Sequence, residues 1–233
     1  MEGGRDGSLP VLPVLPVFPY LQPMIITISR QYGAGGSDVA KRVAAALGWR
    51  VVDNELVEEV ASRAGLPRAD VAEREERVPS FAERLARTLA ASTPELFAAR
   101  VPNGTVPKLQ ETDLVRITES VVGELAAKGK VVLVGRAAPA VLARERDALH
   151  VQLVAPRTYR IQVAAERLGM DAQNAARIVD ETDSMRARYL REYYRRDWYD
   201  PVNYHMVLNT GALGLDGVTE VIVGEAKRRG WMQ

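Results

Sequence analysis

Three glycines and a hydroxyl follow the first apolar stretch of the chain and could bind phosphate. Gly33, Gly35 and Gly36 lie between an apolar run and an amphipathic stretch, and Ser37 comes directly after them. Glycines let a phosphate approach the main chain closely, and the N–H groups at the start of a helix attract anions. The spacing therefore predicts a phosphate-binding loop. The structural alternative is a plain turn before a helix, with Ser37 as the helix cap.

This loop departs from the usual phosphate-loop pattern at two places. Gly35 and Ser37 match the pattern G-x-x-x-x-G-K-[ST], but Arg30 replaces its first glycine and Gly36 replaces its lysine. That lysine normally reaches the β- and γ-phosphates and offsets their charge during transfer. We therefore expect another cation to take over its role, either Arg30 or an arginine from a later part of the chain.

Five short apolar runs alternate with helical patterns and must position this loop. Runs that are apolar at successive positions suit strands buried on both faces of a parallel sheet. Asp216 is expected to cap the helix after the last run. The sequence thus predicts an α/β fold with the loop between its first strand and first helix. The predicted strands span residues 24–29, 50–53, 130–134, 149–155 and 204–209.

Two segments stand apart from the alternating core. Residues 1–23 carry a proline at every third or fourth position of their second half, which predicts an extended, disordered tail. This tail is either a polyproline ligand or a leader without a function. About 75 residues separate the second and third predicted strands, too many for a simple crossover. We therefore expect a helical insertion at about 54–128 within a domain that spans 24–233.

Composition narrows the possible functions. The chain has 31 Lys+Arg against 30 Asp+Glu, so no strong overall field attracts nucleic acid or a membrane. It has no cysteine and only two histidines, His150 and His205, which argues against a zinc site. Both histidines fall in predicted strands and are expected to be structural. No apolar run approaches the ~20 residues of a membrane helix, and no secretory signal is evident, so a cytoplasmic location is expected.

Six short motifs follow one another along the chain: ISRQYGAGGSDVAKRVAAALG, VVDNELV, VVLVGRAA, HVQLVAPRTYRI, IVDETDSMRARYLREYY and YHMVLNTGALGLDGV. In their order and spacing they resemble the cytidylate kinase-like proteins, relatives of the nucleoside monophosphate kinases. The resemblance implies a P-loop kinase fold, a three-layer sandwich with a five-stranded parallel sheet, a helical insertion that binds the nucleoside monophosphate, and a small mobile lid at about 157–175. It also implies ATP and Mg²⁺ as cofactors and CMP or a similar nucleotide as the acceptor.

The same resemblance implies roles for individual residues. Ser37 would bind Mg²⁺, with Asp53 acting through a water molecule. The implied catalytic arginines are Arg30, Arg136 and Arg186. The donor nucleotide would be held by Gly33, Ala34, Gly35, Gly36, Ser37, Arg157 and Arg160, and the acceptor by Asp53, Arg136, Asp183 and Arg188.

Three other functions remain open. Without the lysine, the protein could bind nucleotide as a regulator with little or no catalysis, and the long insertion could adapt it to another small acceptor. The stretch 186–200 interleaves five arginines with aromatic residues, which is typical of single-strand nucleic-acid binders. However, Met185, Tyr189 and Tyr193 share one helical face and indicate a core-facing stripe, so nucleic acid is not the expected partner.

Overall fold

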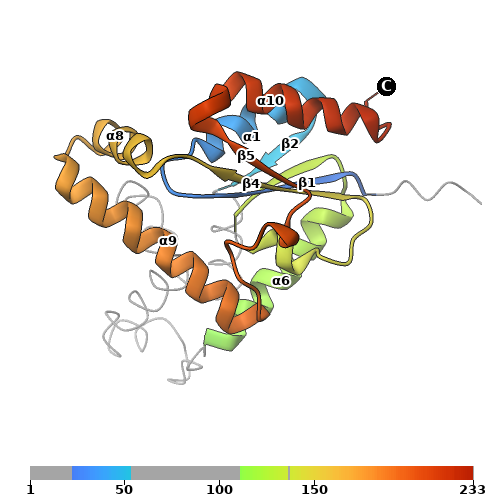
Figure 1. Ribbon diagram of the computed structural model, residues 1–233. Coiled ribbons are helices and arrows are strands. Elements are labelled where there is room, and N and C mark those ends of the chain that lie inside the picture. The colour runs from blue at the N-terminus through green and yellow to red at the C-terminus, as the bar shows by residue number, and fades with distance from the viewer. Residues whose placement is uncertain (1–22, 54–110, 136, 233) are drawn as a thin grey trace, which may run out of the picture.

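A parallel sheet of five strands forms the centre of the molecule (Figure 1). The computed structural model describes residues 23–53, 111–135 and 137–232. The predicted tail, apart from Pro23, and most of the predicted insertion lie outside these residues. All five predicted strands are confirmed, in the order β2-β3-β1-β4-β5. The strands are β1 (Ile25–Arg30), β2 (Arg50–Val52), β3 (Val131–Val134), β4 (Ala148–Val154) and β5 (Met206–Asn209).

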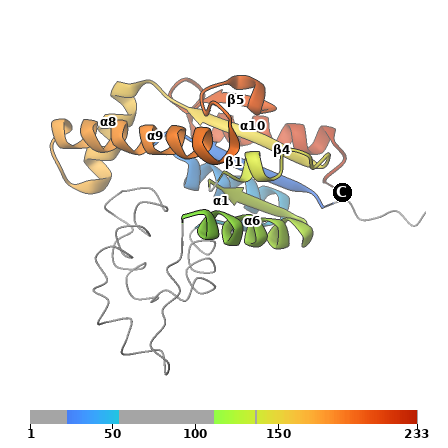
Figure 2. The same cartoon turned by 90° about the horizontal axis from the view of Figure 1, so that it is seen from below.

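Helices cover both faces of the sheet, which confirms the predicted three-layer sandwich. One face packs against α1 (Gly36–Leu47) and α10 (Thr210–Arg228), and the other against α6 (Glu111–Ala127) and α7 (Ala138–Val141). Figure 2, seen from below, shows α6 together with α9 (Ala172–Tyr194) on that second face. Because β1 and β3 are covered on both sides, nearly all their residues are buried, as their continuous apolar runs predict.

Helix α6 belongs to the core sandwich although it falls within the predicted insertion. Its buried residues Val121, Val122 and Ala126 pack with Ile25 and Leu133 of the sheet. The described part of the insertion is therefore the crossover helix that leads into β3. Residues 54–110, which would hold the rest of the insertion, lie outside the described residues.

The helices α8 (Arg157–Leu168) and α9 form a hairpin after β4, at the carboxyl ends of the strands (Figure 1). Buried Ala164 of α8 and Val179 of α9 pack together in its interior. Gly169 ends α8 in the left-handed conformation, and Asp171 caps α9 by accepting a hydrogen bond from the N–H of Asn174. The predicted lid spans α8 and the start of α9.

The last helix begins earlier than the sequence predicts. Asn209 caps α10, because its Oδ1 accepts hydrogen bonds from the N–H groups of Gly211 and Ala212. A kink at Gly214 divides α10 into two helical segments, and the predicted cap, Asp216, lies near the start of the second, where it pairs with Arg42 of α1. Within the described ranges, no helix is long and apolar enough to cross a membrane.

Two histidines join β4 to the residue before β5. The N–H of His150 donates to Nδ1 of His205 at 2.8 Å, and the two rings are stacked with centroids 5.0 Å apart. Nδ1 of His150 lies 2.8 Å from Oγ1 of Thr27. Burial, reinforced by His205, lowers the pKa of His150 from 6.5 to about 4, and burial also lowers the pKa of His205. Both imidazoles are therefore neutral and structural at pH 7.

This pair predicts a loss of stability in mild acid. Between pH 6.5 and about 4 the unfolded chain binds a proton at His150 that the folded chain does not bind. We expect the free energy of unfolding, measured with urea, to fall by about 1–3 kcal/mol across this range, and to fall less in His150→Gln. Equal pH slopes for the two proteins would contradict the assignment.

Candidate active site

The loop between β1 and α1 is built from glycines because its main chain must turn tightly against neighbouring helices. Gly33 and Gly35 have φ angles of 80° and 73°, which side chains rarely adopt. A Cβ on Gly33 would lie 2.6 Å from the carbonyl oxygen of Arg160, and one on Gly35 would lie 2.5 Å from Cδ2 of Leu215. The loop therefore has a defined shape, packed between α8 and α10.

The main-chain amides of this loop can bind an anion. Helix α1 begins at Gly36, and its N-cap, Gly35, offers no side chain to the first turn. Among the described residues, none accepts a hydrogen bond from the amides of Gly33, Gly35, Gly36 or Ser37. These donors lie at the positive end of a 12-residue helix, where phosphate oxygens bind favourably. Ser37 is consequently not the helix cap of the structural alternative.

Ser37 and Asp53 lie together beside the loop. The Ser37 hydroxyl donates to Oδ2 of Asp53 at 2.6 Å, and Oδ1 of Asp53 lies 3.7 Å from Nη2 of Arg30. A hydroxyl and a carboxylate are hard oxygen ligands of the kind that Mg²⁺ takes together with substrate phosphates. The two residues therefore fit the predicted magnesium site. Within the described ranges, no group of three or more His, Cys, Asp or Glu side chains is arranged so that it could hold a metal ion.

Arg30 passes through the space that a lysine at position 36 would need. A Cβ on Gly36 would lie 2.5 Å from Cγ and 2.9 Å from Cβ of Arg30, and a Cβ on Gly135 would meet Nη1 of Arg30. Burial lowers the pKa of the Arg30 guanidinium, whereas the nearby carboxylates of Asp53 and Asp183 raise it. Arg30 therefore stays a cation. The two departures from the usual loop pattern are therefore linked, since Gly36 leaves room for Arg30.

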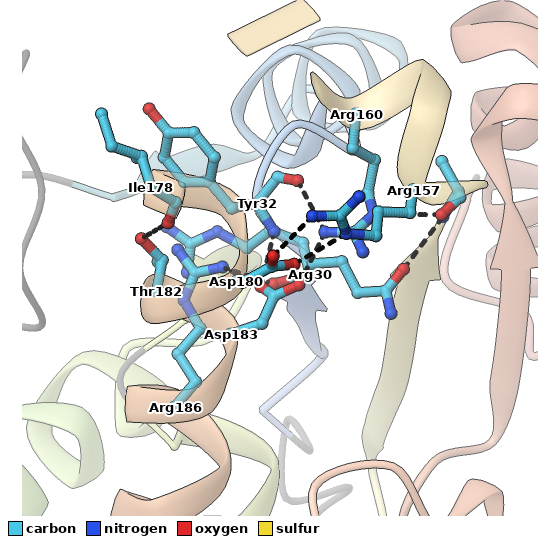
Figure 3. A network of polar contacts seen from close by, with 11 residues as sticks. Arg30, Tyr32, Arg157, Arg160, Ile178, Asp180, Thr182, Asp183 and Arg186 are labelled. Atoms are coloured by element: carbon cyan, nitrogen blue, oxygen red, sulfur yellow. Dashed lines mark hydrogen bonds and ion pairs between the residues drawn. The ribbon is translucent and has the colours of Figure 1, made fainter. Parts of the chain in front are cut away.

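A buried ion pair joins the hairpin to the loop (Figure 3). Nη1 of Arg160 donates to Oδ2 of Asp183 at 2.6 Å and to the carbonyl of Tyr32 at 3.1 Å, while Nε donates to the carbonyl of Ala155 at 3.0 Å. Oδ1 of Asp183 accepts from the N–H of Tyr32 at 2.8 Å. Burial raises the pKa of Asp183, and the hydrogen bond from Tyr32 and the nearby arginines oppose that shift.

Arg186 and Arg157 extend this cluster on either side. Nη1 of Arg186 donates to the carbonyl of Arg30 at 2.8 Å and lies 3.6 Å from Oδ1 of Asp183. Arg157 forms two hydrogen bonds with the Asp180 carboxylate, at 2.9 and 2.6 Å, and about half of each side chain is exposed. Four arginines from β1, α8 and α9 thus lie beside the loop, paired with the carboxylates of Asp53, Asp180 and Asp183.

The structure brings together most of the residues that the sequence singles out. The loop, Arg30, Ser37, Asp53, Arg160, Asp183 and Arg186 are joined by the contacts above. Arg157 lies at the exposed rim, and Arg188 lies on the other side of α9 from Arg186, because residues two apart on a helix do not face each other. Arg136 lies outside the described residues.

Sequence reasoning missed the part that Tyr32 plays in this site, and it noted Gly135 as the neighbour of Arg136 without its role toward Arg30. Tyr32 lies inside the glycine loop, and both of its main-chain groups bond to the hairpin. Gly135 follows β3 and makes room for the Arg30 guanidinium. The sequence did hold a signal for this role of Gly135. Arginine is unusual at position 30, and the glycines at positions 36 and 135 follow strand ends, where they can make room for its side chain. Nothing in the sequence indicates the role of the Tyr32 main chain.

The stretch 186–200 does not present its aromatic residues as a stacking surface. Trp198 is almost fully buried and donates from Nε1 to Oγ of Ser29 at 2.9 Å. Tyr204 donates its hydroxyl to the carbonyl of Trp198, and both pack with Leu190. Of the aromatic residues in this stretch, Tyr199 is the large exposed one. The arrangement favours the core-facing interpretation over nucleic-acid binding.

Comparisons with known proteins agree with this architecture. The model of the cytidylate kinase-like family matches residues 25–212. An uncharacterized protein from Eubacterium ventriosum has the same fold, with a TM-score of 0.64 and 23% identity over 89% of this chain and 99% of its own. No curated protein matches the chain.

Two kinases resemble the chain more distantly. A shikimate kinase from Bacteroides thetaiotaomicron has a TM-score of 0.45 and 14% identity, over 88% of this chain and 98% of its own. A gluconokinase from Sinorhizobium meliloti has a TM-score of 0.48 and 14% identity, over 88% of this chain and 93% of its own.

The packing of Arg30 on Gly36 predicts strong coupling between the two positions. We expect Gly36→Ala to lower the free energy of unfolding by about 1–3 kcal/mol, because the new Cβ would displace the stem of Arg30. In an Arg30→Ala background the same change should cost clearly less, because the 2.5 Å approach to Cγ is gone and only the 2.9 Å approach to Cβ remains. Urea unfolding of the four proteins measures the coupling, and an equal cost in both backgrounds would contradict it.

Proposed function

Because the chain belongs to the cytidylate kinase-like family, we propose that it transfers the terminal phosphoryl group of MgATP to a nucleoside monophosphate, CMP or a similar acceptor. The observation that carries this proposal is the group of available amides at the start of α1, beside the Arg30 guanidinium. Such donors suit the phosphates of a nucleotide. The family supports a kinase-like phosphotransferase, and the nucleotide acceptor is our inference from it.

The donor phosphates would bind at Gly33, Gly35, Gly36 and Ser37, whereas the N–H of Ala34 already donates to the carbonyl of Gln31 at 3.1 Å. Ser37 and Asp53 would hold Mg²⁺, which would supply positive charge to the donor phosphates. Asp53 would act through a coordinated water molecule. Arg30 would offset the charge that the usual lysine offsets, since its stem crosses Gly36 at the start of α1 and its guanidinium lies against Gly135 and near Asp53. Arg157, at the rim, would break its ion pair with Asp180 and then contact the donor nucleotide.

The acceptor would lie on the side of Arg186, with Arg136 as the further arginine that the family implies, whereas Arg188 lies on the other side of α9. An acceptor phosphate oxygen would attack the terminal phosphorus in line, and the bond to the bridging oxygen would break, with its electron pair leaving on ADP. The attacking oxygen already carries charge near neutral pH, so no general base is needed. The residues therefore need to supply position and positive charge.

Movement at the far end of the hairpin would exclude water during transfer. Closure of such a lid limits hydrolysis of ATP and strengthens the electrostatic contacts inside the site. The tip between α8 and α9, around Gly169, is distant in sequence from the contacts with the loop, and we propose this part as the moving segment. In this proposal the protein works on nucleotides in the cytoplasm.

A panel of acceptors tests the reaction. We expect purified protein with MgATP to form ADP and a nucleoside diphosphate, with CMP or another pyrimidine monophosphate as the preferred acceptor. Chromatography resolves the products, and non-nucleotide acceptors in the panel test the other small-acceptor hypothesis. Equal affinity for ADP and ATP without any product would favour a nucleotide-binding regulator. Failure to bind any triphosphate would contradict the proposal as a whole.

Substitution of two arginines tests the source of positive charge. We expect Arg30→Ala and Arg186→Ala each to lower kcat by about 100- to 1,000-fold, as when a donor to developing charge is removed in other enzymes. Arg177→Ala is a matched control, because Arg177 is on the same helix as Arg186 but forms an exposed pair with Glu181. Steady-state kinetics measures all three. Rates close to wild type in both site variants would contradict the assigned roles.

A further inference from the structure

Side chains of the hairpin hold both main-chain groups of one loop residue. The N–H of Tyr32 donates to Asp183 of α9 at 2.8 Å, and the carbonyl of Tyr32 accepts from Arg160 of α8 at 3.1 Å (Figure 3). Tyr32 directly precedes Gly33, the first glycine of the loop. Its peptide groups therefore help to set the direction in which the following amides point.

These contacts are deeply buried. The side chains of Arg160 and Asp183 are 8% and 6% exposed, and each is bonded on more than one side. Apolar residues in place of a buried ion pair are often neutral or stabilising, so stability alone is a weak reason for such a pair. What an apolar pair could not do is bond to the Tyr32 main chain. The polar contacts with the loop give these two charges a distinct role.

Close packing reinforces the polar contacts. The Tyr32 side chain packs against the cluster formed by Ala164, Ala175 and Val179 in the hairpin. Gly33 lies so close to the main chain of Arg160 that it has no room for a Cβ. Loop and hairpin are thus in contact through side chains and through backbone. Neither could move at this point without breaking buried contacts of the other.

We propose that Asp183 and Arg160 are positioning residues that fix the glycine loop through their hydrogen bonds with the N–H and carbonyl of Tyr32, which we call the grip. The loop and the base of the hairpin then move as one body. This inference rests on the proposed function for its purpose, which is to keep the loop amides aimed at phosphate. It departs from the expectation that Arg160 contacts the donor and Asp183 the acceptor. Both act on the nucleotide through Tyr32, because their charged groups are buried against each other.

Amide hydrogen exchange, resolved by NMR, tests the contact directly. In the wild-type protein the Tyr32 amide should exchange at least about tenfold more slowly than the amides of Gly33, Gly35 and Gly36, because it alone donates to a buried carboxylate. This comparison needs no substitution. If the Tyr32 amide exchanged as fast as those three glycines, the proposal would be overturned.

A double variant removes the grip without leaving an unpaired charge. Asp183→Leu with Arg160→Met keeps apolar volume in the buried space and should fold, whereas Asp183→Ala would strand Arg160. We expect the Tyr32 amide to exchange about tenfold faster in the double variant, with the amides of β1 unchanged. A folded double variant with wild-type exchange at Tyr32 would also overturn the proposal.

Asp180→Ala is the matched control. Asp180 is one turn earlier on α9 and also pairs with an arginine of α8, but this pair is exposed and does not touch the loop. Its removal should leave exchange at Tyr32 unchanged, and faster exchange there would assign the effect to the hairpin generally and overturn the specific role of Asp183 and Arg160.

Calorimetry with a non-hydrolysable ATP analogue links the grip to function. We expect the double variant to bind the analogue at least about tenfold more weakly than wild type, since its loop amides are no longer held in place. Undiminished affinity, together with faster exchange at Tyr32, would overturn the purpose assigned to the grip. If the wild-type protein bound no analogue, the proposed function would fail, while the exchange results would still decide whether Asp183 and Arg160 hold the loop.

Discussion

The buried pair between Arg160 and Asp183 is the contact on which the site depends. It brings three segments that are far apart in sequence, the loop after β1, the start of α8 and the middle of α9, to one point. Two charges in this position are tolerable because their charged groups are hydrogen-bonded to each other and to main-chain groups of the protein. The main chain of Tyr32 completes that set. The charges thus satisfy each other and organise a loop whose own glycines would otherwise leave it free.

Sheet topology explains why these groups converge. With β1 at the centre and β3 and β4 beside it, the carboxyl ends of parallel strands place Arg30, Gly135 and Ala155 at one edge. Helix α1 then starts at that edge and points its positive end toward the same space. The apolar residues of the strands do no chemistry, but they fix this geometry. A site made mainly of backbone amides needs that rigidity more than it needs particular side chains.

The sequence predicts the fold well because the signals for it are local. Continuous apolar runs identify all five strands, and glycines such as Gly48 and Gly169 mark helix ends. The glycine loop and its missing lysine can also be recognised by spacing. The start of α10 could not, because Asn209 caps an additional helical segment before the kink at Gly214 by bonding two amides at once. The partner of the Arg160 side chain could not be predicted either, since the sequence pattern of an arginine near the start of a helix is the same whether its side chain meets solvent or a buried carboxylate.

Because Arg30 crosses Gly36 and Gly135, substitutions in this loop are constrained during evolution. A lysine restored at position 36 would collide with the arginine, and removal of the arginine alone would leave the loop with neither cation. Each of these single substitutions is therefore unfavourable, and a return to the usual lysine would require positions 30 and 36 to change together. Arg30 also belongs to the buried strand β1, so the position of its main chain does not depend on the conformation of the glycines beside it.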